Sequence, residues 1–115
     1  MTIDPLFNSV EYALSGLQLR TDTIADNMAN ANTPLYRSKR VAFEDTLATA
    51  LAGGQSTPDM APRVVGGLSI PDAHGNSVQL ETEMTELSKT ALSRQTLISG
   101  FNYKVGIYKI ATGNK

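Results

Sequence analysis

The chain has 115 residues, enough for one domain at most, and its formal net charge of −1 gives no overall attraction to nucleic acid or anionic membranes. Aromatic residues make up only 6% of the chain and tryptophan is absent, so any core must consist mainly of aliphatic side chains. Cysteine is also absent, which excludes a disulfide framework, thiolate metal sites and thiol catalysis.

A long helix is the first predicted element. Asp4 is a suitable N-cap and Pro5 a suitable first helical residue. About 27 residues at ~1.5 Å each make a rod of about 40 Å, typical of bundles and coiled coils. A mostly apolar stripe follows one face at steps of three or four residues, through Leu6, Val10, Ala13, Leu17, Thr21, Ile24, Met28 and Ala31.

The first residues carry neither the positive nor the apolar region of a signal peptide, and no run reaches the roughly 18 apolar residues of a membrane span. We therefore expect no cleaved signal and no direct insertion into a membrane.

The helix is expected to end within residues 25–37. Asn27, Asn30 and Asn32 tolerate the left-handed conformation that ends helices, and Thr33-Pro34 prevents continuation because the residue before proline leaves the α region. Residues 35–42 mix basic and apolar types without a period, which predicts an extended loop carrying a basic patch.

A loop region is predicted over 33–79. It contains a short helix over about 43–52, which stops at Gly53-Gly54. Residues 55–76 are rich in proline and glycine and predict an irregular segment that is either disordered or ordered by a partner, with a short extended piece at 63–65. His74 lies in this polar segment and is interpreted as a solvated side chain.

The second long helix is predicted from about 81 to 111. Glutamates gather in its first turns and lysines near its end, which suits the helix dipole. Gly100 and Gly106 would each cost about 1 kcal/mol relative to alanine unless another backbone packs against them. Its stripe runs through Met84, Leu87, Ala91, Arg94, Ile98, Phe101, Val105 and Tyr108, with Arg94 as the polar exception.

These elements predict an all-α fold in which two long terminal helices pack as a coiled-coil hairpin. The expected divisions are an N-terminal helix over 1–32, the loop region over 33–79 and a C-terminal helix over 80–115. Two helices cannot hide both stripes, and the gain from burial at roughly 25 cal/mol per Å² is close to the entropy cost of ordering the helices. The hypothesis is a protomer that is marginal alone and becomes fully ordered by packing against copies or relatives.

Two motifs together resemble the bacterial flagellar rod and hook family. Residues 25–36, Ala-Asp-Asn-Met-Ala-Asn-Ala-Asn-Thr-Pro-Leu-Tyr, are similar to its N-terminal signature, and residues 76–87, Asn-Ser-Val-Gln-Leu-Glu-Thr-Glu-Met-Thr-Glu-Leu, to its C-terminal one. The short chain, without an inserted β-rich domain, resembles the proximal rod members. Leu35 replaces the family's usual glycine, which argues against the tight turn assumed there, and Arg94 stands where relatives commonly carry tyrosine.

The resemblance implies a structural protein without enzymatic activity or cofactors. It would leave through the flagellar type III apparatus and polymerise in the periplasm into the rod of the basal body, with helices packed as coiled-coil layers that transmit torque. Its partners would be copies of itself, other rod proteins, the export gate and membrane-ring adaptor proteins. Interface or motif roles are expected for Asn27, Met28, Asn30, Thr33, Pro34, Tyr36, Met84, Leu87, Arg94, Ile98, Phe101 and Val105.

Alternatives remain open at this level. No nucleophile and base pair, histidine cluster or phosphate loop favours an enzyme. Arg37, Lys39 and Arg40 lack the aromatic interleaving and surrounding positive charge of a nucleic-acid site, so no nucleic-acid partner is expected. Another short rod protein, or a soluble helical export adaptor or chaperone, would also have amphipathic helices.

Overall fold

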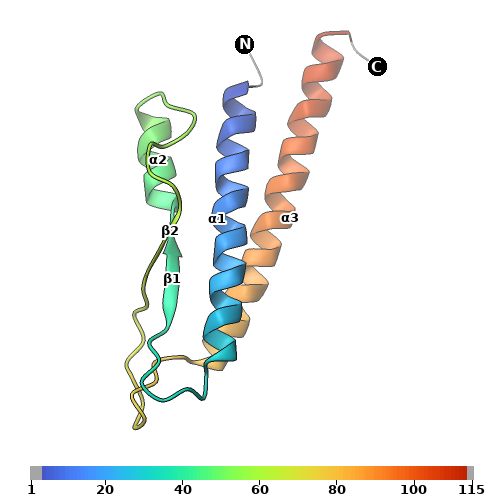
Figure 1. Ribbon diagram of the computed structural model, residues 1–115. Helices are drawn as coiled ribbons and strands as arrows, with labels where there is room; N and C mark the ends of the chain where they lie inside the picture. Colours follow the sequence, from blue (N-terminus) through green and yellow to red (C-terminus); the bar gives the residue numbers. More distant parts are fainter. Residues whose placement is uncertain (1–3, 114–115) are drawn as a thin grey trace.

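The computed structural model describes residues 4–113, and of Asp4 the backbone alone. The N-cap role predicted for the Asp4 side chain, and the outer limits 1 and 115 of the predicted terminal helices, therefore lie outside the described residues. The elements follow in the order α1 (Asp4–Ala29), β1 (Lys39–Ala42), α2 (Glu44–Ala52), β2 (Arg63–Gly66) and α3 (Leu80–Ala111). They form an elongated molecule of 62 × 28 × 15 Å (Figure 1).

The expected all-α class is wrong in one respect, because the middle of the chain forms a small sheet. β1 pairs with β2 in antiparallel register, with Arg40 opposite Val65 and Val41 opposite Val64. The extended piece expected at residues 63–65 is the centre of β2, whereas β1 was expected to be loop. A strand of four residues carries too little alternation to reveal itself, and it is stabilised by a partner that lies more than twenty residues away in sequence.

The core lies between α1 and the middle of the chain. Tyr12 and Leu17 of α1 form a buried cluster with Val41 of β1 and Phe43, the residue before α2. The Phe43 ring packs so close to α1 that a Cβ on Gly16 would lie 2.5 Å from its Cδ1 atom. An aromatic ring therefore approaches α1 closely at Gly16, and a methyl group there would displace it.

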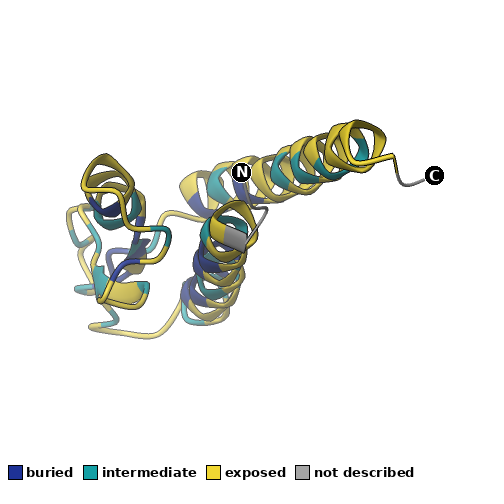
Figure 2. Ribbon diagram, turned by 90° about the horizontal axis from the view of Figure 1, so that it is seen from above, coloured by how far each residue is buried: buried dark blue, intermediate teal, exposed yellow. Residues whose placement is uncertain are grey.

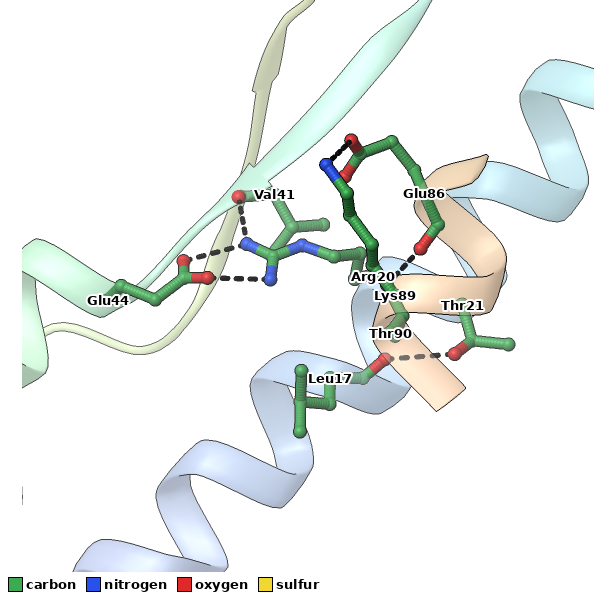
Figure 3. A network of polar contacts seen from close by, with 8 residues as sticks. All are labelled: Leu17, Arg20, Thr21, Val41, Glu44, Glu86, Lys89 and Thr90. Atoms are coloured by element: carbon green, nitrogen blue, oxygen red, sulfur yellow. Dashed lines mark hydrogen bonds and ion pairs between the residues drawn. The ribbon is translucent and has the colours of Figure 1, made fainter. Parts of the chain in front are cut away.

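Polar contacts attach the irregular segments to α1. The Tyr12 hydroxyl donates to the carbonyl of Met60 at 2.7 Å, and the Ser9 hydroxyl donates to the carbonyl of Ser56 at 2.8 Å. The Arg20 guanidinium binds both carboxylate oxygens of Glu44 at 2.7 Å (Figure 3). Side chains of α1 therefore bind the irregular segment at Ser56 and Met60.

α1 and α3 run antiparallel and lie side by side, and Figure 1 shows them diverging toward their free ends. The Phe7 and Phe101 rings meet edge to face with centroids 6.0 Å apart. The buried row of α3 begins one residue before the predicted stripe, at Glu83 and Thr90 rather than Met84 and Ala91. Because the first half of that row is polar, hydrophobicity alone could not mark it.

The observed limits of the three helices lie within two residues of the predicted ones. α2 begins one residue after the predicted start and ends at Ala52, as the two following glycines indicate. α3 covers 80–111, and α1 ends at Ala29, two residues before the last position of its predicted stripe. Among the described residues, no helix combines the length and the apolar character that crossing a membrane would require.

Candidate assembly interface

A buried asparagine joins three elements where α1 ends and α3 begins. Asn27 is fully buried, and its Nδ2 donates to the backbone carbonyl of Lys39 at 2.7 Å and to Oε1 of Glu83 at 3.1 Å. Its Oδ1 accepts from the backbone N–H of Lys39 at 2.9 Å. One amide therefore fixes the start of β1 and the first turns of α3 against α1.

A second set of bonds closes the loop before α3. Nδ2 of Asn76 donates to the carbonyls of Asn30 and Thr33 at 2.9 and 2.7 Å, and Oδ1 of Asn76 accepts from the backbone of Val78. The hydroxyl of Ser77 accepts from the backbone N–H of Ser38 at 2.7 Å. We call Asn27, Asn76, Ser77 and Glu83, with the backbone groups that they bind, the polar junction.

The turn after α1 uses the backbone shape that glycine favours, although its residue is leucine. Leu35 has φ of 64°, in the left-handed region, and its N–H donates to the carbonyl of His74 at 3.0 Å. The doubt that the sequence raised about this turn is therefore resolved, because leucine adopts the left-handed conformation there. A β-carbon in this conformation costs roughly 1–2 kcal/mol, so the turn is formed at a local expense.

Three carboxyl groups in and near the junction have shifted pKa values, and the causes differ. The carboxylate of Glu83 is buried, and this desolvation raises its pKa, while the bond from Asn27 works in the opposite direction. Asp72 behaves differently, because its carboxylate accepts from the backbone N–H groups of Asn76 and His74, which lowers its pKa. The pKa of Glu44 is lowered too, first by its hydrogen bonds from Arg20.

Beyond the junction, α3 presents apolar side chains to solvent. Figure 2 shows α3 as mostly exposed while the buried residues gather on α1 and the elements beside it. A Cβ on Gly100 or Gly106 would meet no atom within 4 Å, so the described chain does not supply the close neighbour expected there. We use the name outward face of α3 for its exposed large apolar residues, namely Leu80, Met84, Leu87, Leu92, Ile98, Tyr103, Ile107, Tyr108 and Ile110.

The predicted site residues divide into two groups. Those near the turn come together around the junction, where Asn30 and Thr33 offer carbonyls to Asn76 and the carbonyl of Tyr36 accepts from the N–H of Ser77. Met28 is half-buried beside them and Pro34 is exposed.

The predicted residues of α3 do not come together as a site within the chain. Met84, Leu87 and Ile98 belong to its outward face, and Arg94 is exposed as well. Phe101 and Val105 are half-buried, with Phe101 against Phe7 of α1.

Sequence reasoning missed the residues that close the junction from the C-terminal side. The sequence explains Glu83 only as one of the glutamates that suit the dipole of the second helix. It places Asn76 and Ser77 in the second motif and predicts no role for either. The available signal was their place in that motif, because each binds a residue of the first motif: Glu83 binds Asn27, Asn76 binds Asn30, and the N–H of Ser77 binds the Tyr36 carbonyl. No group of three or more metal-ligating side chains occurs among the residues that the structure describes.

Comparison with known proteins shows the family to which the chain belongs. A family model described as flagella basal body rod protein matches residues 7–37, which cover most of α1 and the turn. A flagellar basal body rod protein FlgB from Borrelia hermsii is 30% identical, over 64% of this chain and 70% of that protein. The chain therefore belongs to the flagellar basal body rod protein family. It is a structural subunit of the rod.

Other relatives extend the likeness to nearly the whole chain. FlgB from Bacillus subtilis (strain 168) is 29% identical and covers 93% of both chains. FlgB from Aeromonas hydrophila is 25% identical over the full chain and 98% of that protein. Both motifs of the polar junction lie within these matches, so the likeness includes the C-terminal helix.

Proposed function

We propose that this chain is a proximal rod subunit that polymerises by helix packing and transmits torque across those contacts. The outward face of α3 carries this proposal. Met84 is 58% exposed and Ile98 38% exposed, although burying such side chains is worth about 1.5–3 kcal/mol each. Large apolar side chains that stay exposed along a long helix are typical of a protein interface.

The polar junction, which lies at the first turns of α3, also supports the proposal. It binds the first turns of α3 to α1 and β1, so the outward face is held at a fixed angle to the rest of the chain. A rigid base with an apolar helix face suits a subunit that must pack in a regular array and carry load. Surface ion pairs would serve less well, since each is worth about 1 kcal/mol or less.

Family membership supports a role without catalysis, and the three FlgB relatives favour the proximal rod over a short rod protein of the FlgC type. The partners are copies of this chain and other rod proteins, with the export gate and membrane-ring adaptor proteins at the base of a periplasmic rod. The thin molecule has a small core, which suits export through the flagellar type III apparatus in an unfolded state.

The test is the substitution Ile98→Asp. It places a charge on the outward face where the free subunit tolerates one but a packed helix does not, since an unpaired buried charge costs several kcal/mol. We expect folded subunits, no swimming and no subunit in purified basal bodies.

Thr49→Asp is the matched control, because Thr49 is exposed and polar and lies in α2, outside the proposed contact. It should swim as the unchanged protein does. Normal swimming of cells that carry only the Ile98→Asp chain would refute the assignment of this face.

A further inference from the structure

The two-stranded sheet of β1 and β2, which we call the hairpin although α2 lies between its strands, carries a patch of cationic side chains. Arg37, Lys39, Arg40 and Arg63 are all exposed. The strand register places Arg40 opposite Val65 and Arg63 opposite Ala42, so the two arginines share one face of the hairpin as diagonal neighbours. Diagonal positions on a sheet are about 7–8 Å apart. We call Arg40 and Arg63 the hairpin cation pair.

Arg40 and Arg63 form no ion pair in the part of the chain that the structure describes, although Glu44, Asp45 and Glu86 line the same pocket as both arginines. Among the described residues, the ion pairs are Arg20–Glu44 and Lys89–Glu86, and neither includes a hairpin cation. Nε of Arg40 donates to the carbonyl of Gly66, and Arg63 contacts the sulfur of Met60, so both bind neutral groups. An anionic partner can therefore approach both guanidinium groups.

α1 carries a matching anionic face on the side away from the core. Glu11, Asp22 and Asp26 are exposed and lie at i, i+11 and i+15, which a helix of about 100° per residue brings to one side. The neighbouring Gln18 donates to Asp22, and no cation pairs with these three carboxylates among the described residues. Asp22 and Asp26 are one turn apart, about 6 Å, close to the spacing of the hairpin cation pair.

We propose that the hairpin cation pair of one subunit docks on Asp22 and Asp26 of α1 in a second copy of this chain. This inference rests on the proposed function, to which it adds a contact apart from the outward face of α3. The two surfaces differ, so the contact is head to tail, and repeated contacts of that kind produce a ring or an open helical array rather than a two-fold pair.

The chemistry favours a second copy over a nucleic acid or a lipid surface. The net charge of −1 provides no long-range attraction to a polyanion. The carboxylate pair on α1 has the spacing of the cation pair and is carried by every subunit. In an array, each hairpin therefore has a matching face nearby at very high local concentration.

The experiment reverses the charge on each face in the full chain, expressed as the sole copy in swimming cells. One variant carries Asp22→Lys and Asp26→Lys, the second Arg40→Glu and Arg63→Glu, and the third all four changes. Each one-sided variant should lower the subunit content of purified basal bodies about tenfold, which corresponds to about 1.4 kcal/mol per contact. The variant with all four changes should restore it, because the pairing is re-formed with opposite sign.

A matched control carries Asp59→Lys and Glu81→Lys, which add the same charge at exposed positions outside α1 and the hairpin. Far-UV circular dichroism of each purified variant verifies that it folds. Control-like incorporation of both one-sided variants overturns the proposal. So does failure of the four-change variant to recover, the result expected if the hairpin binds nucleic acid or lipid instead. Neither failure affects the proposed function, which depends on the unchanged subunit being present in the rod.

Discussion

Removal of the Asn27 amide is the most direct perturbation of the polar junction. Asn27 has no exposed surface and forms two hydrogen bonds as donor and one as acceptor through its side chain. The change Asn27→Ala leaves the backbone N–H and C=O of Lys39 without their partner and removes the donor to the buried carboxylate of Glu83. The loss therefore falls on three partner groups at once.

The size of the effect follows from those groups. A buried polar group left without a partner costs about 1–3 kcal/mol, and a charged one costs more. Lys39 lies at an exposed edge, so water can satisfy part of its backbone, which favours the lower end of that range there. We expect the free energy of unfolding to fall by about 3 kcal/mol, a large share of the roughly 5–15 kcal/mol of a typical domain.

Urea unfolding followed by far-UV circular dichroism measures this loss. Asn32→Ala is the control, because Asn32 is exposed in the turn five residues later, and it should change the free energy of unfolding by about 0.5 kcal/mol or less. A double-mutant cycle with Glu83→Gln should show coupling between the two side chains. A loss below about 1 kcal/mol for Asn27→Ala would show that the amide does not join these elements.

Two further predictions concern the same end of the molecule. Leu35→Gly should raise the melting temperature and stabilise the fold by up to about 1 kcal/mol, because glycine adopts the positive φ of that turn without strain. Arg37→Gly is the control and should not raise the melting temperature. A lower melting temperature for Leu35→Gly contradicts the strain argument. The raised pKa of Glu83 means that the folded chain binds this proton more tightly than the unfolded chain. Any stability gained by Glu83→Gln at neutral pH should therefore shrink as the pH falls through the folded pKa of Glu83 toward 4.5, and an unchanged difference across that window in urea titrations excludes a buried, desolvated carboxylate.

Residues that start or stop helices predicted most of the helix limits. Prolines, asparagines and the glycine pair mark the ends of α1 and α2, and these signals are local, so they depend little on tertiary structure. The two strands are different, because each is only four residues long and is stabilised by a distant partner.

The face that each helix buries was harder to predict. On α1 the predicted stripe contains Leu17 and Ile24, which are buried, but it omits Tyr12, which packs against residues contributed by the loop region. On α3 the buried row begins with Glu83 and Thr90, two polar residues that no hydrophobic pattern would select. Met84, Leu87 and Ile98 of the predicted stripe therefore remain exposed, whereas Phe101 and Val105 are half-buried.

The polar junction was visible in the sequence only as two separate motifs. Asparagine favours turns and caps, so Asn27 was interpreted as a turn residue, although it lies inside α1 and binds β1 and α3. The pairing of Asn76 with the turn after α1 spans more than forty residues, and no local rule predicts it. The family resemblance identified the two motifs, and the structure shows that they bind each other.

Burial of the outward face of α3 in the assembled rod is the central claim, and thiol labelling tests it most directly. The chain has no cysteine, so Ile98→Cys introduces a single thiol at a known position. That thiol should react rapidly with a maleimide in the free subunit and should be protected in purified basal bodies that contain the subunit. Equal reactivity in the free and assembled forms would contradict the claim.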